Sequence, residues 1–213
     1  ATLWEKCYGG ADYDRANAVL PTADGGSIVA GHTQSYADGY TPPPHNKKDI
    51  WILKLDGNGD KLWEVVHGGK EADGINAIDR TPDGGYIAAG FTASYGQGGY
   101  DCEVLRLGPG GDIIWEKAYG GTLPDMANCV RTTTDGGFIV AGETWSYGAG
   151  KTDFWVLKLS QDGSVQWSRT VGGAGFERAQ SIAQTSDGGY LVAGYTSSSG
   201  AGNKDVWTVK LDA

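Results

Sequence analysis

The stretch DGGYLVAGYT, residues 187–196, is the last of four copies of one sequence pattern. The Asp-Gly-Gly triplet that opens each copy starts at Asp24, Asp83, Asp135 and Asp187, in steps of 59, 52 and 52 residues. A tryptophan recurs in step with the triplet, at Trp4, Trp63, Trp115 and Trp167. A fixed period of about 50 residues is typical of propellers and solenoids, in which one unit cannot bury its apolar face without neighbours. The repeat therefore predicts an all-β fold.

Each copy has room for four short strands. The first includes residues 76–78 and their equivalents, and the second runs over residues 86–92, after a tight turn at Asp-Gly-Gly whose glycines accept a positive φ. The third, such as residues 154–159, is almost continuously apolar, which favours a strand buried on both faces. The fourth carries the tryptophan and ends in Gly-Gly. The repeats cover approximately residues 11–67, 70–119, 122–171, and 174–213 together with 1–8.

The two ends of the chain complement each other within this pattern. The chain begins inside a fourth strand, at residues 3–8, and ends just after a third strand, at residues 206–211. Joining them restores a hairpin, and closure of a sheet ring removes exposed strand edges. We therefore predict one domain, 1–213, that forms a four-bladed β-propeller of four-stranded blades, with the N-terminal strand completing the last blade. The alternatives are half of an eight-bladed ring shared by two chains, or a fragment of a longer protein.

Composition limits the classes of partner. The formal net charge of −9 argues against a nucleic-acid partner and against an anionic membrane surface. No apolar run approaches the ~18 residues of a membrane-spanning helix, so no membrane insertion is expected. The three cysteines make no even disulfide framework, and we expect them to be free thiols.

The repeat resembles a known family. Residues 153–159, 162–163, 167–173 and 187–196 are similar to the SBBP-type β-propeller repeat of secreted and cell-surface proteins. The resemblance spans the whole chain; it implies a propeller fold and an extracellular or cell-surface location, and it implies no reaction. A weaker likeness, at residues 55–63, is to the blades of pyrroloquinoline-quinone propellers. Those enzymes have eight blades and an active-site set that this sequence lacks, so we expect no such cofactor.

Four acidic residues recur ahead of the first strand of each copy, at Asp14, Asp73, Asp125 and Glu177. If that strand lines the propeller axis, the four carboxylates lie near one mouth of the channel and repel one another unless a cation or donors compensate. Oxygen ligands of this kind suit calcium, the one metal that we consider for the site. The alternative is that each carboxylate accepts backbone hydrogen bonds and caps its own turn.

The copies differ most in the loop between the second and third strands. In the first copy this loop, residues 35–48, is seven residues longer than its equivalents and contains three prolines. Trp145 stands where the other copies have Gln34, Ala93 and Ser197. The remaining aromatic residues on these loops are Tyr36, Tyr40, Tyr95, Tyr100 and Tyr147. Rigid aromatic rings beside carboxylates favour a surface that binds a glycan or a protein. The alternative is that the loops pack on one another.

The sequence contains no nucleophile-elbow motif, no paired-histidine metal motif and no phosphate-binding loop. We therefore expect a non-catalytic extracellular binding or adhesion module, with its glycan or protein ligand on the loop face. One alternative is a structural subunit that self-associates in a surface assembly or filament. The other is a small lyase or glycosidase that acts at the channel mouth, since two acidic residues of the ring could form a catalytic pair.

Overall fold

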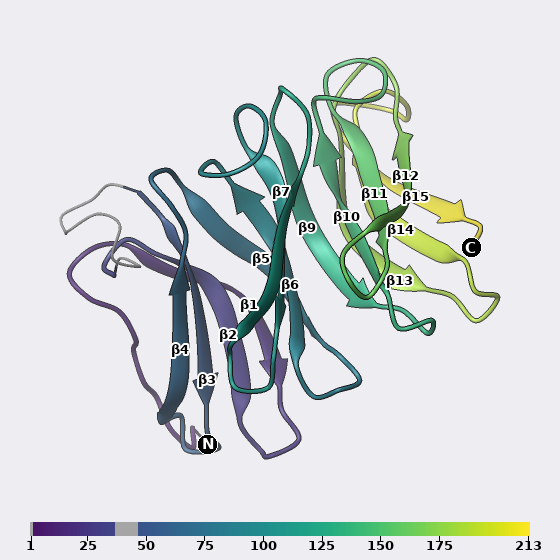
Figure 1. Ribbon diagram of the computed structural model, residues 1–213. Coiled ribbons are helices and arrows are strands. Elements are labelled where there is room, and N and C mark those ends of the chain that lie inside the picture. Colours follow the sequence, from purple (N-terminus) through teal and green to yellow (C-terminus); the bar gives the residue numbers. More distant parts are fainter. Residues whose placement is uncertain (1, 37–46) are drawn as a thin grey trace.

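The chain folds into four antiparallel β-sheets that stand side by side (Figure 1). The computed structural model describes residues 2–36 and 47–213, so most of the long first loop, with Tyr40, lies outside the described residues. The sheets follow the four copies of the repeat in chain order, and within each sheet consecutive strands are hydrogen-bonded neighbours. The all-β class and the repeated sheets predicted from the sequence are thus confirmed.

The strands of each sheet are as follows. The first sheet consists of β1 (Asp14–Pro21), β2 (Ser27–Thr33), β3 (Asp49–Leu55) and β4 (Lys61–His67). The second consists of β5 (Asp73–Arg80), β6 (Tyr86–Thr92), β7 (Asp101–Leu107) and β8 (Ile113–Tyr119). The third consists of β9 (Asp125–Thr132), β10 (Phe138–Thr144), β11 (Asp153–Leu159) and β12 (Val165–Val171). The fourth consists of β13 (Glu177–Gln184), β14 (Tyr190–Thr196) and β15 (Asp205–Leu211).

The Asp-Gly-Gly turns need both of their glycines. In the third sheet Gly136 has a φ of +81°, and a Cβ on Gly137 would lie 2.3 Å from the Leu159 carbonyl oxygen. The aspartate of the same turn, Asp135, pairs with the buried Lys158 at 2.8 Å. Burial acts to raise the pKa of Asp135, but Lys158 and local donors outweigh it and lower the pKa to about 2. The turn, the third strand and the buried cation are therefore one repeated unit.

Asparagines link neighbouring sheets through their first strands. Each lies at a register shift in the first strand and donates its side-chain N–H to a backbone carbonyl in the first strand of the next sheet. The pairs are Asn17 with Ile75, Asn76 with Ala127, and Asn128 with Ala179, at 2.8, 2.8 and 2.9 Å. The first strands thus contact one another in sequence and form the inner side of the row.

The core lies between successive sheets. One buried cluster joins the first and second sheets, another the second and third, and another the third and fourth. Strands β3, β7 and β11 are buried at every position, as their apolar sequences predict. In the last sheet β15 is different, because alternate residues are exposed; Val206 is 87% exposed.

The described residues do not form a closed ring. Within them β15 pairs with β14 alone, and the two chain ends lie at opposite ends of the row (Figure 1). Residues 2–8, predicted to pair with β15, instead lie along the first sheet, where Trp4 donates to the Gly57 carbonyl and Tyr8 to the Gly59 carbonyl. The outer strand β8 makes equivalent contacts with the third sheet, from Trp115 to Gln161 and from Tyr119 to Gly163. The N-terminal segment therefore occupies the place of a fourth strand from a preceding sheet.

Candidate functional site

The four repeated carboxylates are each held by a glycine amide four residues earlier and by hydroxyls at the end of the paired second strand. Asp73 accepts hydrogen bonds from the Thr92 hydroxyl at 2.5 Å, the Ser94 hydroxyl at 2.7 Å and the Gly69 amide at 2.9 Å. A serine hydroxyl and a glycine amide hold the other three, Asp14, Asp125 and Glu177, in the same way. The amide bonds cap the turn ahead of each first strand, as in the alternative given from the sequence, while the hydroxyl bonds tie that turn to the second strand.

The electrostatics of these carboxylates fit that local role. Burial acts to raise the pKa of Asp14, but bonds from Thr33, Ser35 and Gly10 outweigh it and the net pKa is lowered. The pKa of Glu177 is lowered against the same opposing effect of burial. Among the described residues, the four side chains are not gathered within ligand distance of one cation. Calcium binding at this ring stays a prediction.

The tyrosines of the equivalent loops have one hydrogen bond in common. The hydroxyls of Tyr36, Tyr95 and Tyr147 donate to the carbonyls of Gly9, Gly68 and Gly120, respectively. These bonds fix the loops, while the rings stay between a third and a half exposed. In the first and third sheets the ring also packs on a third-strand tryptophan, Tyr36 on Trp51 and Tyr147 on Trp155, with centroids 5.3 and 5.7 Å apart.

Trp145 projects toward the fourth sheet. It is 42% exposed, and its ring meets the edge of Phe176 with centroids 5.9 Å apart. Lys151 lies over the same phenylalanine, 4.5 Å from the ring centroid. Tyr100, another predicted residue, packs edge-on against Phe91 in the second sheet. The predicted aromatic residues therefore lie at several sheet boundaries and do not form one cluster.

An aromatic groove of about 480 Å³ lies between the second and third sheets. Tyr119 from β8, Tyr147 from the loop and Trp155 from β11 supply its rings. The Trp155 indole N–H donates to the Ser168 hydroxyl at 2.9 Å, which fixes the indole in the wall. Its other lining residues are Ala118, Gly120, Leu157 and Val165. The lining carries no charged side chain.

Both phenols in this groove remain protonated at neutral pH. Burial raises the pKa of Tyr119 above its ordinary value, and neighbouring ionised groups act in the same direction. Burial likewise raises the pKa of Tyr147. The groove is therefore a neutral surface of aromatic faces.

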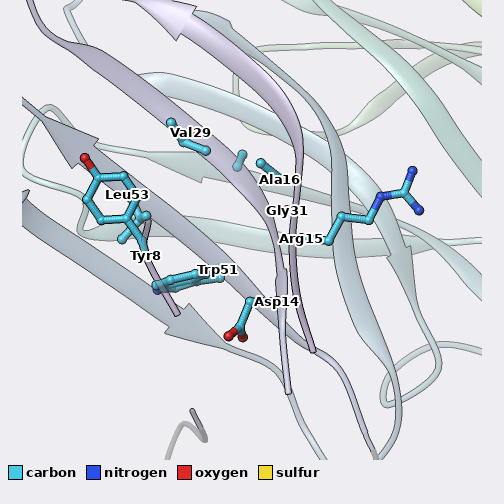
Figure 2. A pocket seen from close by; sticks show the side chains of 9 residues that line it. Tyr8, Asp14, Arg15, Ala16, Val29, Gly31, Trp51 and Leu53 are labelled. Atoms are coloured by element: carbon cyan, nitrogen blue, oxygen red, sulfur yellow. The ribbon is translucent and has the colours of Figure 1, made fainter. Parts of the chain in front are cut away.

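The first sheet carries a smaller cavity at the equivalent place. It has a volume of about 90 Å³, and Figure 2 shows Tyr8, Trp51 and Val29 around it, with the Arg15 side chain extending away. The Trp51 indole donates to Glu64 at 3.1 Å, as Trp155 does to Ser168. The repeat thus places a tyrosine beside a tryptophan both at the first sheet and between the second and third sheets. Of these two places, the groove between the second and third sheets has room for a ligand fragment.

The second sheet departs from this arrangement. Glu103 of β7 stands where the other third strands have Trp51, Trp155 and Trp207. The fully buried Glu103 lies beside Glu116 of β8 and His67 of β4, and one ligand atom from each falls within 4.8 Å of the others. Within the described part of the chain, this is the group of acidic and imidazole side chains with the spacing to hold a metal ion.

Sequence reasoning named Tyr147 but missed the rest of the groove. Trp155 and Tyr119 recur in other copies, which is typical of scaffold residues, and their joint exposure depends on how two sheets meet. The cluster was missed because His67, Glu103 and Glu116 come from different strands. The one signal in the sequence is a glutamate at a position where three copies have tryptophan.

Comparisons with known proteins add little to this geometry. A scan against protein-family models and a search of curated protein sequences matched nothing. Among solved structures, the fold is similar to that of Sqt1 from Chaetomium thermophilum, with a TM-score of 0.44 and 14% sequence identity. That match covers 84% of this chain and 41% of Sqt1. No helix in the described residues is long and apolar enough to cross a membrane.

Proposed function

We propose that this protein is a non-catalytic, propeller-type binding module that holds a neutral glycan in the groove between its second and third sheets. The observation that carries the proposal is the lining of that groove: three aromatic rings, the hydroxyls of two tyrosines and one serine, and no charged side chain. Aromatic rings offer the apolar faces of a sugar a large contact area with little loss of side-chain entropy. The repeat resemblance supports an extracellular or cell-surface setting for such a module.

A second aromatic contact lies on the same loop. Trp145 and Tyr147 are two residues apart, yet Tyr147 faces the groove and Trp145 faces Phe176 of the next boundary. A large aromatic that stays 42% exposed favours a surface covered by a partner. An extended glycan that crosses this loop would reach both rings, whereas a monosaccharide would contact the groove alone.

The experiment is a screen of the purified protein against an array of neutral oligosaccharides, followed by calorimetry on any hit. We expect Tyr147→Ala and Trp145→Ala each to weaken binding by about 1–3 kcal/mol, the range for aromatic residues at binding sites. Tyr95→Ala is the matched control, because Tyr95 has the same loop position and the same glycine contact on the second sheet. Equal loss in all three variants would show a general effect on the loops and would contradict the proposal.

A second candidate function, assembly through the sheet edges, is favoured by the two ends of the row. β15 leaves one edge without a strand partner in the described chain, and residues 2–8 occupy the place of an outer strand at the other end. We propose that residues 3–8 of a second copy pair with β15, so that two chains complete one propeller ring. Because the ends lie far apart in one chain, this pairing needs no rearrangement of the row (Figure 1).

The assembly proposal is tested by the mass of the protein in solution. Light scattering after size exclusion should give twice the mass of one chain, and deletion of residues 1–8 should give aggregates, since the apolar edge at Val206 loses its cover. A monomer that keeps its melting temperature after the deletion would contradict edge pairing. A monomer that loses stability on deletion would reflect only the contacts of Trp4 and Tyr8 with the first sheet, and it would also contradict edge pairing.

A further inference from the structure

The boundary between the first and second sheets replaces aromatic residues by ionisable ones at two of three positions. Tyr119 of the second sheet meets Trp155 and Ser168 of the third, and Tyr8 of the N-terminal segment meets Trp51 and Glu64 of the first sheet. The equivalent set at the second sheet is His67, Glu103 and Glu116. The two replacements, His67 for a tyrosine and Glu103 for a tryptophan, lie side by side and form one polar cluster. A purely structural role of this position does not explain them.

Glu103 lacks the compensation that a buried carboxylate requires. Its side chain is 0% exposed, and neither carboxylate oxygen receives a hydrogen bond from a donor among the described residues. The polar group that faces it is the carboxyl group of Glu116, one of whose oxygens is also without a donor. Burying an ionised carboxylate without a partner is strongly unfavourable. A proton or a cation must therefore sit between the two carboxyl groups.

The titration behaviour of the pair agrees with this geometry. Burial raises the pKa of Glu103 well above its ordinary value, and the neighbouring Glu116 acts in the same direction. Burial also acts to raise the pKa of Glu116, but the neighbouring His67 is among the groups that outweigh it, and the net pKa is lowered. Two buried carboxyl groups this close, without other donors, share a proton when no cation is present.

The donor set decides which cation fits. The His67 Nε2 lies 2.9 Å from a Glu116 carboxylate oxygen, and the three ligand atoms fall within 4.8 Å of one another. A tetrahedral zinc ion at about 2.0–2.2 Å from its ligand atoms holds them roughly 3.3–3.6 Å apart, so small side-chain shifts would close these three atoms around it. An imidazole ligand selects first-row transition metals, whereas calcium and magnesium prefer oxygen ligands alone.

We propose that His67, Glu103 and Glu116 bind a divalent transition-metal ion at the boundary between the first and second sheets. Glu103 forms the buried base of the site, while His67 and Glu116, with side chains 23% and 27% exposed, form its rim. Three protein ligands leave one tetrahedral position for water, on the side of the rim. The site lies at a different boundary from the aromatic groove and does not depend on it.

Metal binding at this site should release protons. Two carboxylates and a neutral imidazole balance the ion's charge, so the proton that the two carboxyl groups share has to leave when the metal enters. Calorimetry of chelator-treated protein with zinc chloride, in two buffers of different ionisation enthalpy, measures the number of protons released per zinc ion. We expect one zinc ion per chain and the release of at least one proton per ion.

The variants are made in a Cys7→Ser background, because the exposed Cys7 thiol could itself bind zinc. Glu103→Gln should weaken zinc binding at least tenfold, whereas Glu64→Gln, the equivalent of Glu116 on the first sheet, should leave it unchanged. The double variant His67→Tyr, Glu103→Trp restores the arrangement of the sibling sheets and should fold without binding zinc here. The d–d absorption of added cobalt should disappear in the same variants.

Two results would overturn the proposal. One is the absence of zinc and cobalt binding in the Cys7→Ser protein; the other is binding that survives in the folded double variant with its proton release unchanged. If Glu103→Gln fails to fold, the double variant alone decides whether these residues bind the metal. Circular dichroism of each variant establishes which of them have folded.

Discussion

The boundary between the first and second sheets and the boundary between the second and third are built from the same repeat, yet they carry opposite chemistry. The later boundary buries Trp155 behind an open aromatic groove, and the earlier one buries Glu103 against a second carboxyl group. The strands, turns and asparagine links on the two sides are equivalent. The fold therefore tolerates either a glutamate or a tryptophan at the position of Glu103 and Trp155. We infer that the residue found there serves the boundary at which it lies.

The largest expected effect comes from removing the aromatic wall. Trp155→Ala should lower the free energy of unfolding by about 3–5 kcal/mol, because it leaves a cavity in the cluster between the second and third sheets. Glu103→Ala at the equivalent position should cost much less, since the residue removed is a carboxyl group without donors. Urea unfolding of both variants gives the comparison. Equal losses would show that Glu103 is part of the packing in the way that Trp155 is.

The first and second sheets also differ at a second buried position, which carries a titratable group in the first sheet only. His32 of β2 is buried where the second sheet has Phe91, and burial, aided by Lys48 and Arg15, lowers its pKa to about 4. Between this value and the unfolded value of 6.5, only the unfolded state binds the proton, so stability must fall as the pH falls through that window. The loss amounts to roughly 3 kcal/mol at pH 4.

The matched variant for this prediction is His32→Phe, which gives the first sheet the residue of the second. Denaturant unfolding between pH 7 and pH 4 should show the acid loss in the natural protein and a smaller one in the variant. An unchanged slope in His32→Phe would assign the acid sensitivity to other groups, such as the carboxylates paired with Lys54 and Lys158.

A smaller effect of opposite sign is expected at Glu103 in the metal-free protein. Its pKa is raised on folding, so the folded state keeps a proton that the unfolded state releases, and this group's contribution to stability is lost as the pH rises above the unfolded value. Glu103→Gln removes that dependence and offers an N–H to the Glu116 oxygen that has no donor. We expect a gain of about 1–2 kcal/mol at pH 8. Destabilisation at pH 8 would mean that Glu103 is already compensated there.

Much of the fold follows from the repeat, because glycine turns and apolar strands are local features. The second strand predicted over residues 86–92 coincides with β6, and the third-strand apolar run coincides with the buried β11. The partner of residues 3–8 was not predictable from the pattern. The pattern shows which strand type is missing from the last sheet, but which sheet those residues contact depends on the curvature of the whole row.

The candidate sites show the same limit. Comparing the copies identified Trp145, because a departure from the repeat is visible in the sequence, and it identified Tyr147 as one of three equivalent loop tyrosines. The groove depends on the meeting of Tyr119 with Trp155, 36 residues later, and the polar cluster on the meeting of His67 with Glu103. These contacts form only when neighbouring sheets pack together. A residue that is the same in several copies gives no sign in the sequence that it will take part in such a contact.

We infer that the two boundaries have diverged to bind different ligands, and nitrogen-15 NMR spectra of the side chains can follow both boundaries in one sample. A glycan identified on the array should shift the Trp155 indole N–H signal and leave that of Trp51, its sibling on the first sheet, in place. Zinc added to the same sample should shift the ring nitrogens of His67 and leave Trp155 in place. If either ligand shifts both boundaries, or if neither moves its own reporter, the account is contradicted.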